Sequence, residues 1–214
     1  MTNRKTRVLL VDDHPVVRTG NRRLLEGSGE FEVVGEAADG EAAYRLYCQS
    51  RPDVVVMDLA MPGMGGLEAI RRILAWDDAA RILVFSMHET GTMLTQAMKS
   101  GARGFLSKTA PPEEFPEAVR KVAADTVFVE GRLLPGALER EPREREPGLA
   151  ALSPREFEVF RLLAEGHRVP EIGEALEISP KTVGVHRARV MQKLGTRSTV
   201  QLLRLALNHG VVTV

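Results

Sequence analysis

The chain of 214 residues contains a single cysteine, Cys48, so it cannot form an internal disulfide. A lone cysteine beside Leu46 and Tyr47 is more typical of a packing residue than of a nucleophile, and it fits a reducing compartment. Long apolar runs are also lacking near the start, where a run of only four apolar residues, 8–11, leads to Asp12. That run is far too short for a signal-peptide core or a membrane span. We therefore expect a soluble cytoplasmic protein with no membrane segment.

Acidic residues are missing from the C-terminal end. No Asp or Glu follows Glu177, although the whole chain balances 29 acidic against 29 basic residues. The basic residues beyond that point are Lys181, Arg187, Arg189, Lys193, Arg197 and Arg204. A surface of one charge sign is a candidate for binding a polyanion. On charge alone, a solvated helical face with its counter-charges elsewhere is an equally good interpretation.

Length and composition predict two ordinary globular domains, because 43% of the residues are hydrophobic and 27% are charged. In the first half, short apolar runs alternate with helical patterns. Strands are predicted at residues 8–11, 31–37, 54–57, 82–85 and 105–106, and helices at 40–49, 67–74, 93–100 and 113–122. Almost wholly apolar strands alternating with helices predict an α/β fold, with a parallel sheet covered by helices on both faces.

The second half begins after a polar segment, residues 139–148, which has no apolar residue except its prolines and cannot bury a face. Ser153, Pro154 and Glu156 then form the pattern of a capping box. That helix ends at Gly166, and further helices are predicted at about 170–176, 180–195 and 199–208. We predict an α/β domain over residues 5–125, a linker over 126–149 and a small all-α domain over 150–214.

Polar residues follow the four strongest apolar runs. They are Asp12 and Asp13, Asp58, Ser86, and Lys108. Because the carboxyl ends of parallel strands share one edge of a sheet, these side chains should converge there. Carboxylate oxygens are ligands that Mg²⁺ prefers. A bound metal on one side, with an ammonium and a hydroxyl on the other, can neutralise the charge of a phosphoryl group while it is transferred to another carboxylate. Asp58 is the natural acceptor, since it ends what should be a central strand.

These segments resemble the receiver domain of two-component response regulators. The matching stretches are residues 8–14 (VLLVDDH), 57–66 (MDLAMPGMGG), 85–87 (FSM) and 104–108 (GFLSK). The resemblance implies a flavodoxin-like, doubly wound five-stranded sheet of order 2-1-3-4-5. It further implies phosphorylation of Asp58 by a sensor histidine kinase. By the same resemblance, Mg²⁺ is bound by Asp12, Asp13, Asp58 and the carbonyl of Ala60. Lys108 and Ser86 contact the phosphoryl group, and Phe105 is the aromatic residue that swings inward on activation.

The chain departs from the receiver pattern at three places. Ala60 cannot orient an attacking water, and Met87 beside Ser86 is bulky, so we expect the phosphate to be lost slowly. Thr109 follows Lys108 where many receivers have proline, so no cis peptide bond is expected there. His14 and His88 are interpreted as polar loop residues rather than as ligands.

The C-terminal segments are similar to the LuxR-type helix-turn-helix. The matching stretches are residues 152–156 (LSPRE), 162–166 (LLAEG), 178–183 (ISPKTV), 185–186 (VH) and 193–195 (KLG). Together with the receiver they resemble a NarL/FixJ-type response regulator, whose third helix lies in the DNA major groove. The resemblance also implies a homodimer through the fourth helix, which would read an inverted repeat. The apolar residues proposed for that dimer surface are Leu202, Leu203, Leu205 and Ala206.

Helical geometry divides the third helix into two faces. Val183, Val190 and Leu194 share the core face, and the opposite face carries Lys181, Val185, Ala188 and Gln192. The predicted DNA contacts are Lys181, Thr182, Val185, His186, Ala188, Arg189, Gln192, Lys193 and Arg197. Relatives often carry polar side chains where this chain has Gly184 and Ala188, so we expect mostly phosphate contacts and modest base discrimination.

The sequence thus predicts a transcription regulator switched by phosphorylation of Asp58, and not an enzyme. One rival is a Mg²⁺-dependent phosphohydrolase with an aspartyl nucleophile, although Ala60 stands where such an enzyme needs a second Asp. Another is a receiver that controls DNA binding without being phosphorylated, and the intact set of pocket residues argues against it.

Overall fold

The computed structural model describes residues 4–87, 91–131, 148–209 and 211–212. Two compact units make up the chain, one of residues 1–87 with 100–131 and the other of 88–99 with 132–214. His88 and most of the predicted linker, residues 132–147, lie outside the described residues. Within the described part, every helix is too short or too polar to cross a membrane.

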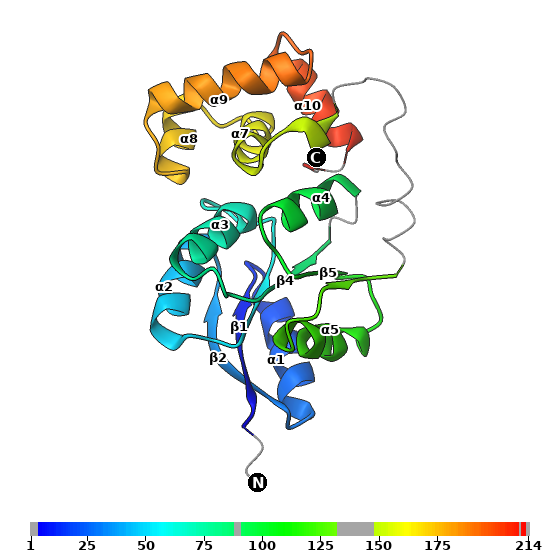
Figure 1. The fold of residues 1–214 in the computed structure, drawn as a ribbon. Coiled ribbons are helices and arrows are strands. Elements are labelled where there is room, and N and C mark those ends of the chain that lie inside the picture. The colour runs from blue at the N-terminus through cyan, green and yellow to red at the C-terminus, as the bar shows by residue number, and fades with distance from the viewer. Residues whose placement is uncertain (1–3, 88–90, 132–147, 210, 213–214) are drawn as a thin grey trace. The chain divides into compact units, whose positions relative to one another are not determined.

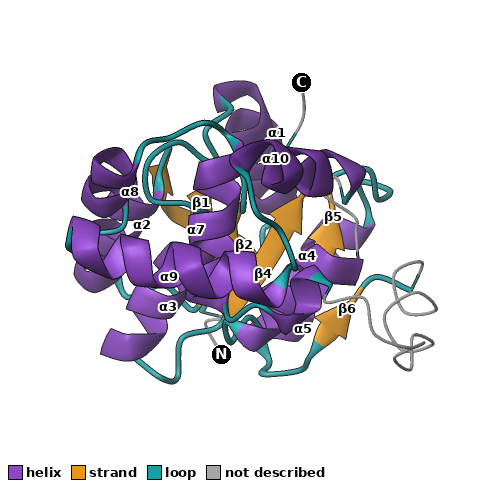
Figure 2. Ribbon diagram, turned by 90° about the horizontal axis from the view of Figure 1, so that it is seen from above, coloured by secondary structure: helices purple, strands orange, loops and turns teal. Residues whose placement is uncertain are grey.

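The first unit is built on a parallel sheet of order β2-β1-β3-β4-β5-β6. Its strands are β1 (Thr6–Val11), β2 (Phe31–Ala37), β3 (Val54–Met57), β4 (Ile82–Ser86), β5 (Gly104–Ser107) and β6 (Phe128–Val129). The predicted five-strand order is therefore confirmed, with one strand added. β6 pairs with β5 at the sheet edge (Figure 2) and falls at the start of the predicted linker. The apolar run at residues 127–129 carried a strand signal, but the predicted linker included it.

Helices cover both faces of this sheet. α1 (Pro15–Gly27) and α5 (Glu114–Ala123) lie on one face, and α2 (Gly40–Ser50) and α3 (Gly66–Trp76) on the other (Figure 1). In β1, Val8 and Leu10 join the α1/α5 core cluster, and the residue between them, Leu9, is also fully buried. Burial on both faces explains why the strand is wholly apolar. α1 was not predicted, because polar residues interrupt its apolar positions.

The second unit is helical. It contains α4 (Gly91–Lys99), the 3₁₀ turn η1 (Leu149–Ala151), α7 (Pro154–Ala164), α8 (Val169–Ala175), α9 (Pro180–Lys193) and α10 (Thr199–Asn208). The predicted capping box begins α7: Ser153 Oγ accepts from the Glu156 N–H at 3.3 Å, and Glu156 Oε2 accepts from the Ser153 N–H at 2.8 Å. In α4, the fully buried Gln96 donates to the carbonyls of Leu149 and Leu152.

α8 and α9 form a helix-turn-helix with a tight junction. Glu177 adopts φ 50°, and the Ile178 N–H donates to the Gly173 carbonyl at 2.9 Å. A side chain at Gly173 would place its Cβ 2.8 Å from the Ile178 carbonyl oxygen, so only glycine permits this close approach. The junction thereby fixes where α9 begins, and Ser179 caps it by accepting from the Thr182 N–H.

Candidate functional site

Charged side chains from three strands meet at one edge of the sheet. Asp12 follows β1, Asp58 follows β3 and Lys108 follows β5, and the parallel order places all three strand ends on the same side. Lys108 Nζ lies 2.5 Å from Asp12 Oδ2 and 2.6 Å from Asp58 Oδ2. Both carboxylates are buried, with only 3% of each residue exposed. The predicted convergence of these residues is therefore what the structure shows.

Asp13 and His14 complete an acidic cluster with Asp12 and Asp58. One ligand atom from each of the four lies within 4.8 Å of the others. Ligands on opposite sides of a Mg²⁺ ion stand about 4.2 Å apart, so the three carboxylates need little adjustment to share one ion. Asp13 Oδ1 lies 2.7 Å from His14 Nδ1, so a cation bound by this oxygen would compete with the imidazole. The donor set fits a hard divalent metal.

Burial and neighbouring charges shift the ionisation of the central pair. Burial alone would lower the pKa of Lys108, but the carboxylates of Asp58 and Asp12 outweigh it and hold that pKa above its usual value. Burial raises the pKa of Asp58, and Lys108 opposes this shift without cancelling it, while Asp12 adds to it. The site thus holds an ammonium against a buried Asp58 carboxylate that is costly to keep charged.

Backbone contacts fix the orientation of the reacting groups. The N–H groups of Leu59 and Ala60 donate to Asp58 Oδ1 at 2.7 and 3.3 Å, so its Oδ2 is the oxygen turned toward Lys108. The Lys108 N–H donates to the Ser86 carbonyl at 2.9 Å, which joins the ends of β4 and β5. Ser86 itself is fully buried. The exposed Ala60 presents only a methyl group beside this pocket.

Two residues at this edge of the sheet were not predicted from the sequence to contribute to the site. Glu130, at the start of the predicted linker, is 2% exposed, and its Oε2 accepts from the Ser107 N–H at 2.9 Å, directly before Lys108. His14 was expected to be a polar loop residue. It stands directly before α1, makes no capping hydrogen bond with its side chain, and places its Nδ1 3.3 Å from Asp12 Oδ1 and 2.7 Å from Asp13 Oδ1. Phe105 is fully buried in β5. All peptide bonds in the described residues are trans, as expected at Thr109.

A second candidate surface lies on α9. Val183 and Val190 are fully buried and Leu194 is 7% exposed, which confirms the predicted core face. The exposed residues of the helix are Pro180, Lys181, Thr182, Gly184, Val185, Ala188, Arg189 and Gln192. His186 is partly buried, and Arg197 is exposed just beyond the helix. The predicted groove-facing residues therefore share one accessible side.

Lys193 has a partner within the protein. Its Nζ lies 2.6 Å from Glu156 Oε2 and donates to the Ala151 carbonyl at 3.2 Å. This ion pair ties the end of α9 to the start of α7, so much of the Lys193 charge is already neutralised. A contact from Lys193 to a DNA phosphate would have to share this ammonium.

The Glu156–Lys193 pair makes stability depend on pH. Burial raises the pKa of Glu156, but the hydrogen bonds from Lys193 and Ser153 outweigh it, and the net pKa is lowered. A lowered carboxyl pKa stabilises the fold above the unfolded value of about 4.3 and loses this effect as the pH falls through the folded value. We expect Glu156→Gln to cost about 1 kcal/mol at pH 7, because Lys193 is partly exposed. Urea unfolding at several pH values should show this difference shrinking below about pH 4.5.

Gly184 weakens α9 without a packing reason. A Cβ built there meets nothing within 4 Å. Glycine inside a helix costs about 1 kcal/mol relative to alanine, so Gly184→Ala should stabilise the second unit by about that amount. Thermal unfolding of the full chain measures the change. If the thermal unfolding midpoint of Gly184→Ala were unchanged or lower, the added methyl group would not be accommodated without steric conflict.

The predicted dimer surface on α10 needs a correction. Leu202 and Ala206 are fully buried, since this side of α10 packs on α7, so they are not available to a second copy. The exposed apolar residues of α10 are Val200 at 76%, and Leu203 and Leu207 at 38% each. Their spacing places them on one side of the helix. The sequence showed apolar residues on more than one side but not which side faces the core.

Two protein families match the chain. The response regulator receiver domain matches residues 8–120, and the luxR family of bacterial regulatory proteins matches residues 150–206. The response regulator UvrY of Escherichia coli is 40% identical over 95% of this chain and 94% of its own length. The response regulator GacA of Pseudomonas aeruginosa is 38% identical over 96% and 97%.

Solved structures of response regulators are similar to this chain. A LuxR-family two-component response regulator from Aurantimonas is 44% identical with a TM-score of 0.62, covering 64% of this chain and 97% of that one. RcsB from Salmonella enterica serovar Typhimurium, bound to a promoter in the presence of the phosphomimetic BeF₃⁻, is 29% identical with a TM-score of 0.76. That match covers 98% of this chain and all of RcsB.

Proposed function

The chain belongs to the two-component response regulators that join a receiver domain to a LuxR-type DNA-binding domain, and from this we propose that Asp58 is its phosphoacceptor. The observation that carries the proposal is the contact of Asp58 Oδ2 with Lys108 Nζ at a buried sheet edge. Oδ1 is held by two backbone N–H groups, so Oδ2, which faces Lys108, is the oxygen that would react. It would attack the phosphorus of a phosphohistidine on a sensor kinase, forming a P–O bond as the P–N bond breaks and the imidazole nitrogen keeps the electron pair.

Asp12, Asp13 and Asp58, with the carbonyl of Ala60, would hold Mg²⁺. The bound ion would supply positive charge to the phosphoryl oxygens. Lys108 would leave the Asp58 carboxylate for the new phosphoryl group, and the Ser86 hydroxyl would hydrogen-bond the same group. Phe105 would respond to the movement of Ser86. Each of these roles rests on position at the sheet edge and on the family resemblance.

The second unit would carry the output. The exposed face of α9 would enter the major groove, with Lys181, Arg189 and Gln192 making polar contacts and Val185 meeting a thymine methyl. A homodimer through Val200, Leu203 and Leu207 would read an inverted repeat. Phosphorylation would favour this dimer, and the regulator would act in the cytoplasm on a signal from its kinase.

Phosphoryl labelling tests the proposal. The full chain is incubated with acetyl phosphate and Mg²⁺, and the acyl phosphate is reduced with borohydride so that mass spectrometry maps the modified residue. We expect one phosphoryl group at residue 58, and none when EDTA removes the metal, because the uncompensated carboxylates repel the anionic donor. Modification elsewhere, or equal labelling in EDTA, would contradict the assignment.

The same reaction separates a regulator from a phosphohydrolase. A hydrolase would release inorganic phosphate continuously and accumulate little adduct. Because Ala60 offers no group to orient water, we expect the adduct to persist well beyond seconds and to raise affinity for target DNA. Rapid phosphate release with no change in DNA binding would favour the hydrolase.

A further inference from the structure

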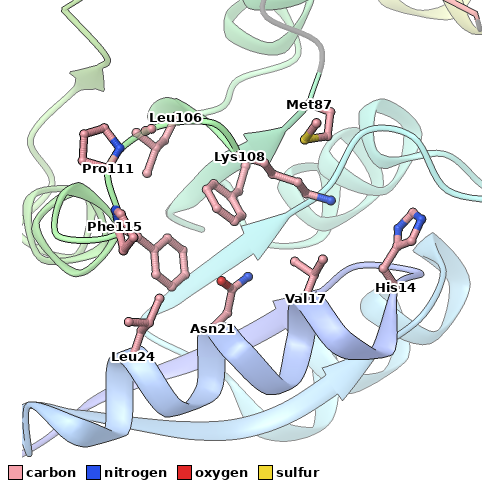
Figure 3. A pocket seen from close by; sticks show the side chains of 12 residues that line it. His14, Val17, Asn21, Leu24, Met87, Leu106, Lys108, Pro111 and Phe115 are labelled. Carbon is pink, nitrogen blue, oxygen red and sulfur yellow. The ribbon is translucent and has the colours of Figure 1, made fainter.

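The position of Lys108 depends on the residue before it. Ser107 is fully buried, its carbonyl accepts from the Ala110 N–H at 3.2 Å, and its Oγ accepts from the Thr109 N–H at 3.0 Å. Thr109 is not a proline, so these hydrogen bonds, and not a ring, constrain the turn that follows β5. Figure 3 shows the Lys108 side chain reaching from this turn toward His14. The backbone of Ser107 therefore decides where the Lys108 ammonium lies.

The Ser107 N–H is held by the carboxylate of Glu130. β5 and β6 form a parallel ladder, in which the Glu130 N–H donates to the Phe105 carbonyl at 3.1 Å. If β6 continued, the next bond would run from the Ser107 N–H to the backbone carbonyl of Glu130. β6 ends at Val129, and Glu130 Oε2 accepts from the Ser107 N–H at 2.9 Å instead. The side chain of Glu130 thereby extends the ladder beyond the last residue of the strand.

The buried carboxylate of Glu130 makes a stronger bond than a backbone carbonyl would. Glu130 is 2% exposed, and burying a carboxylate is unfavourable unless hydrogen bonds satisfy it. A charged acceptor forms a shorter and stronger hydrogen bond than a neutral one. The bond fixes the residue directly before Lys108, whose own N–H donates to the Ser86 carbonyl at 2.9 Å. The end of β5 is thus held from both sides, by Glu130 at Ser107 and by β4 at Lys108.

We infer that Glu130 is a positioning residue for phosphoryl transfer. Its carboxylate holds the end of β5, and so keeps the Lys108 ammonium beside Asp58 and beside the phosphoryl group that Asp58 receives. It acts through Ser107 and Lys108, not on the reacting atoms. A displacement of about 1 Å can slow a reaction about 100-fold, so even a small movement of Lys108 should be measurable. The inference rests on the assignment of Asp58 as the phosphoacceptor.

Two variants at Glu130 separate the hydrogen bond from the charge. Glu130→Ala removes both, whereas Glu130→Gln removes the charge and keeps an oxygen that can accept from the Ser107 N–H. With acetyl phosphate and Mg²⁺, we expect Glu130→Ala to be labelled about 10-fold more slowly than the unmodified chain, and Glu130→Gln to stay within about 3-fold of it. Equal labelling rates for the two variants, or for Glu130→Ala and the unmodified chain, would overturn the inference.

A control in α2 and a double-mutant cycle distinguish positioning from a general loss of stability. Tyr47→Phe removes one hydrogen bond, from the Tyr47 hydroxyl to Asp77 Oδ2 at 2.9 Å, and should leave the labelling rate unchanged. If Glu130 acts through Lys108, Glu130→Ala should cause no further slowing in a Lys108→Ala background. Slowing that multiplies in the double variant, or equal slowing by Tyr47→Phe, would contradict the proposed role.

Amide hydrogen exchange of the full chain tests the contact without the reaction. The Ser107 and Lys108 amides should exchange about 10-fold faster in Glu130→Ala and recover in Glu130→Gln, because the end of β5 opens locally when its acceptor is lost. Unchanged exchange at both amides would overturn the inference. If the unmodified chain is not labelled at residue 58, the phosphoacceptor assignment fails, and the exchange rates still decide whether Glu130 holds the segment that carries Lys108.

Discussion

Replacing Asp58 with Asn is expected to reduce phosphoryl incorporation from acetyl phosphate by more than about 10³-fold. The amide keeps the size of the side chain, and its oxygen can still accept from the Leu59 and Ala60 N–H groups, so the loop should stay in place. The nucleophilic carboxylate oxygen that faces Lys108 is lost. Intact mass after a fixed incubation measures the adduct, and DNA affinity with the donor present should fall to the value without it.

The matched control lies at the other end of the same strand. Asp53 precedes β3, where it accepts from the Arg7 N–H at 2.8 Å and pairs with Arg4. Asp53→Asn should leave labelling unchanged, because the opposite sheet edge takes no part in the reaction. Its cost in stability should be below about 1 kcal/mol, because Arg4 is exposed. If Asp58→Asn were still labelled, Asp58 would not be the phosphoacceptor, and a neighbouring carboxylate such as Asp13 would take that role.

The sequence predicted the acidic edge because strand ends are easy to locate. An apolar run that stops at Asp12, Asp58 or Ser86 marks both the strand and its carboxyl end, and parallel pairing then brings these ends together. The structure agrees on the strand order and on the contacts of Lys108 with the two carboxylates. The faces of α9 were equally predictable, because a helix turns by a fixed angle per residue.

Contacts between distant residues were not predictable in this way. Glu130 supports the end of β5 from just beyond a short apolar run, residues 127–129, and nothing in that run indicates which strand it pairs with. In α1, polar residues interrupt the apolar positions, so the helical pattern is weak. Lys193 belonged to a basic cluster in the sequence, and only the fold shows Glu156 opposite it. On α10, the apolar residues alone could not separate Leu202, which packs inward, from Leu203, which is exposed.

Replacing Gly66 with Ala is expected to destabilise the first unit strongly, although it adds only one methyl group. Gly66 begins α3, and a Cβ there would lie 2.0 Å from the Asp58 carbonyl oxygen and 2.8 Å from Leu59 Cα. Both neighbours are backbone atoms of the loop that positions the phosphoacceptor, so neither can move aside without displacing Asp58. Overpacking of this kind costs about 3 kcal/mol, and the rate of phosphoryl labelling should fall together with stability.

Gly20→Ala provides the control with the opposite sign. Gly20 lies inside α1, and a Cβ there meets nothing within 4 Å, so the added methyl should stabilise the helix by about 1 kcal/mol. Trp76, the sole tryptophan, ends α3 with the Arg51 guanidinium 3.7 Å from its ring centroid, and its fluorescence reports unfolding of this unit. Urea midpoints should therefore move in opposite directions for the two variants. If Gly66→Ala matched Gly20→Ala in stability and labelling, the close approach of α3 to the Asp58 loop would not be what holds the acceptor in place.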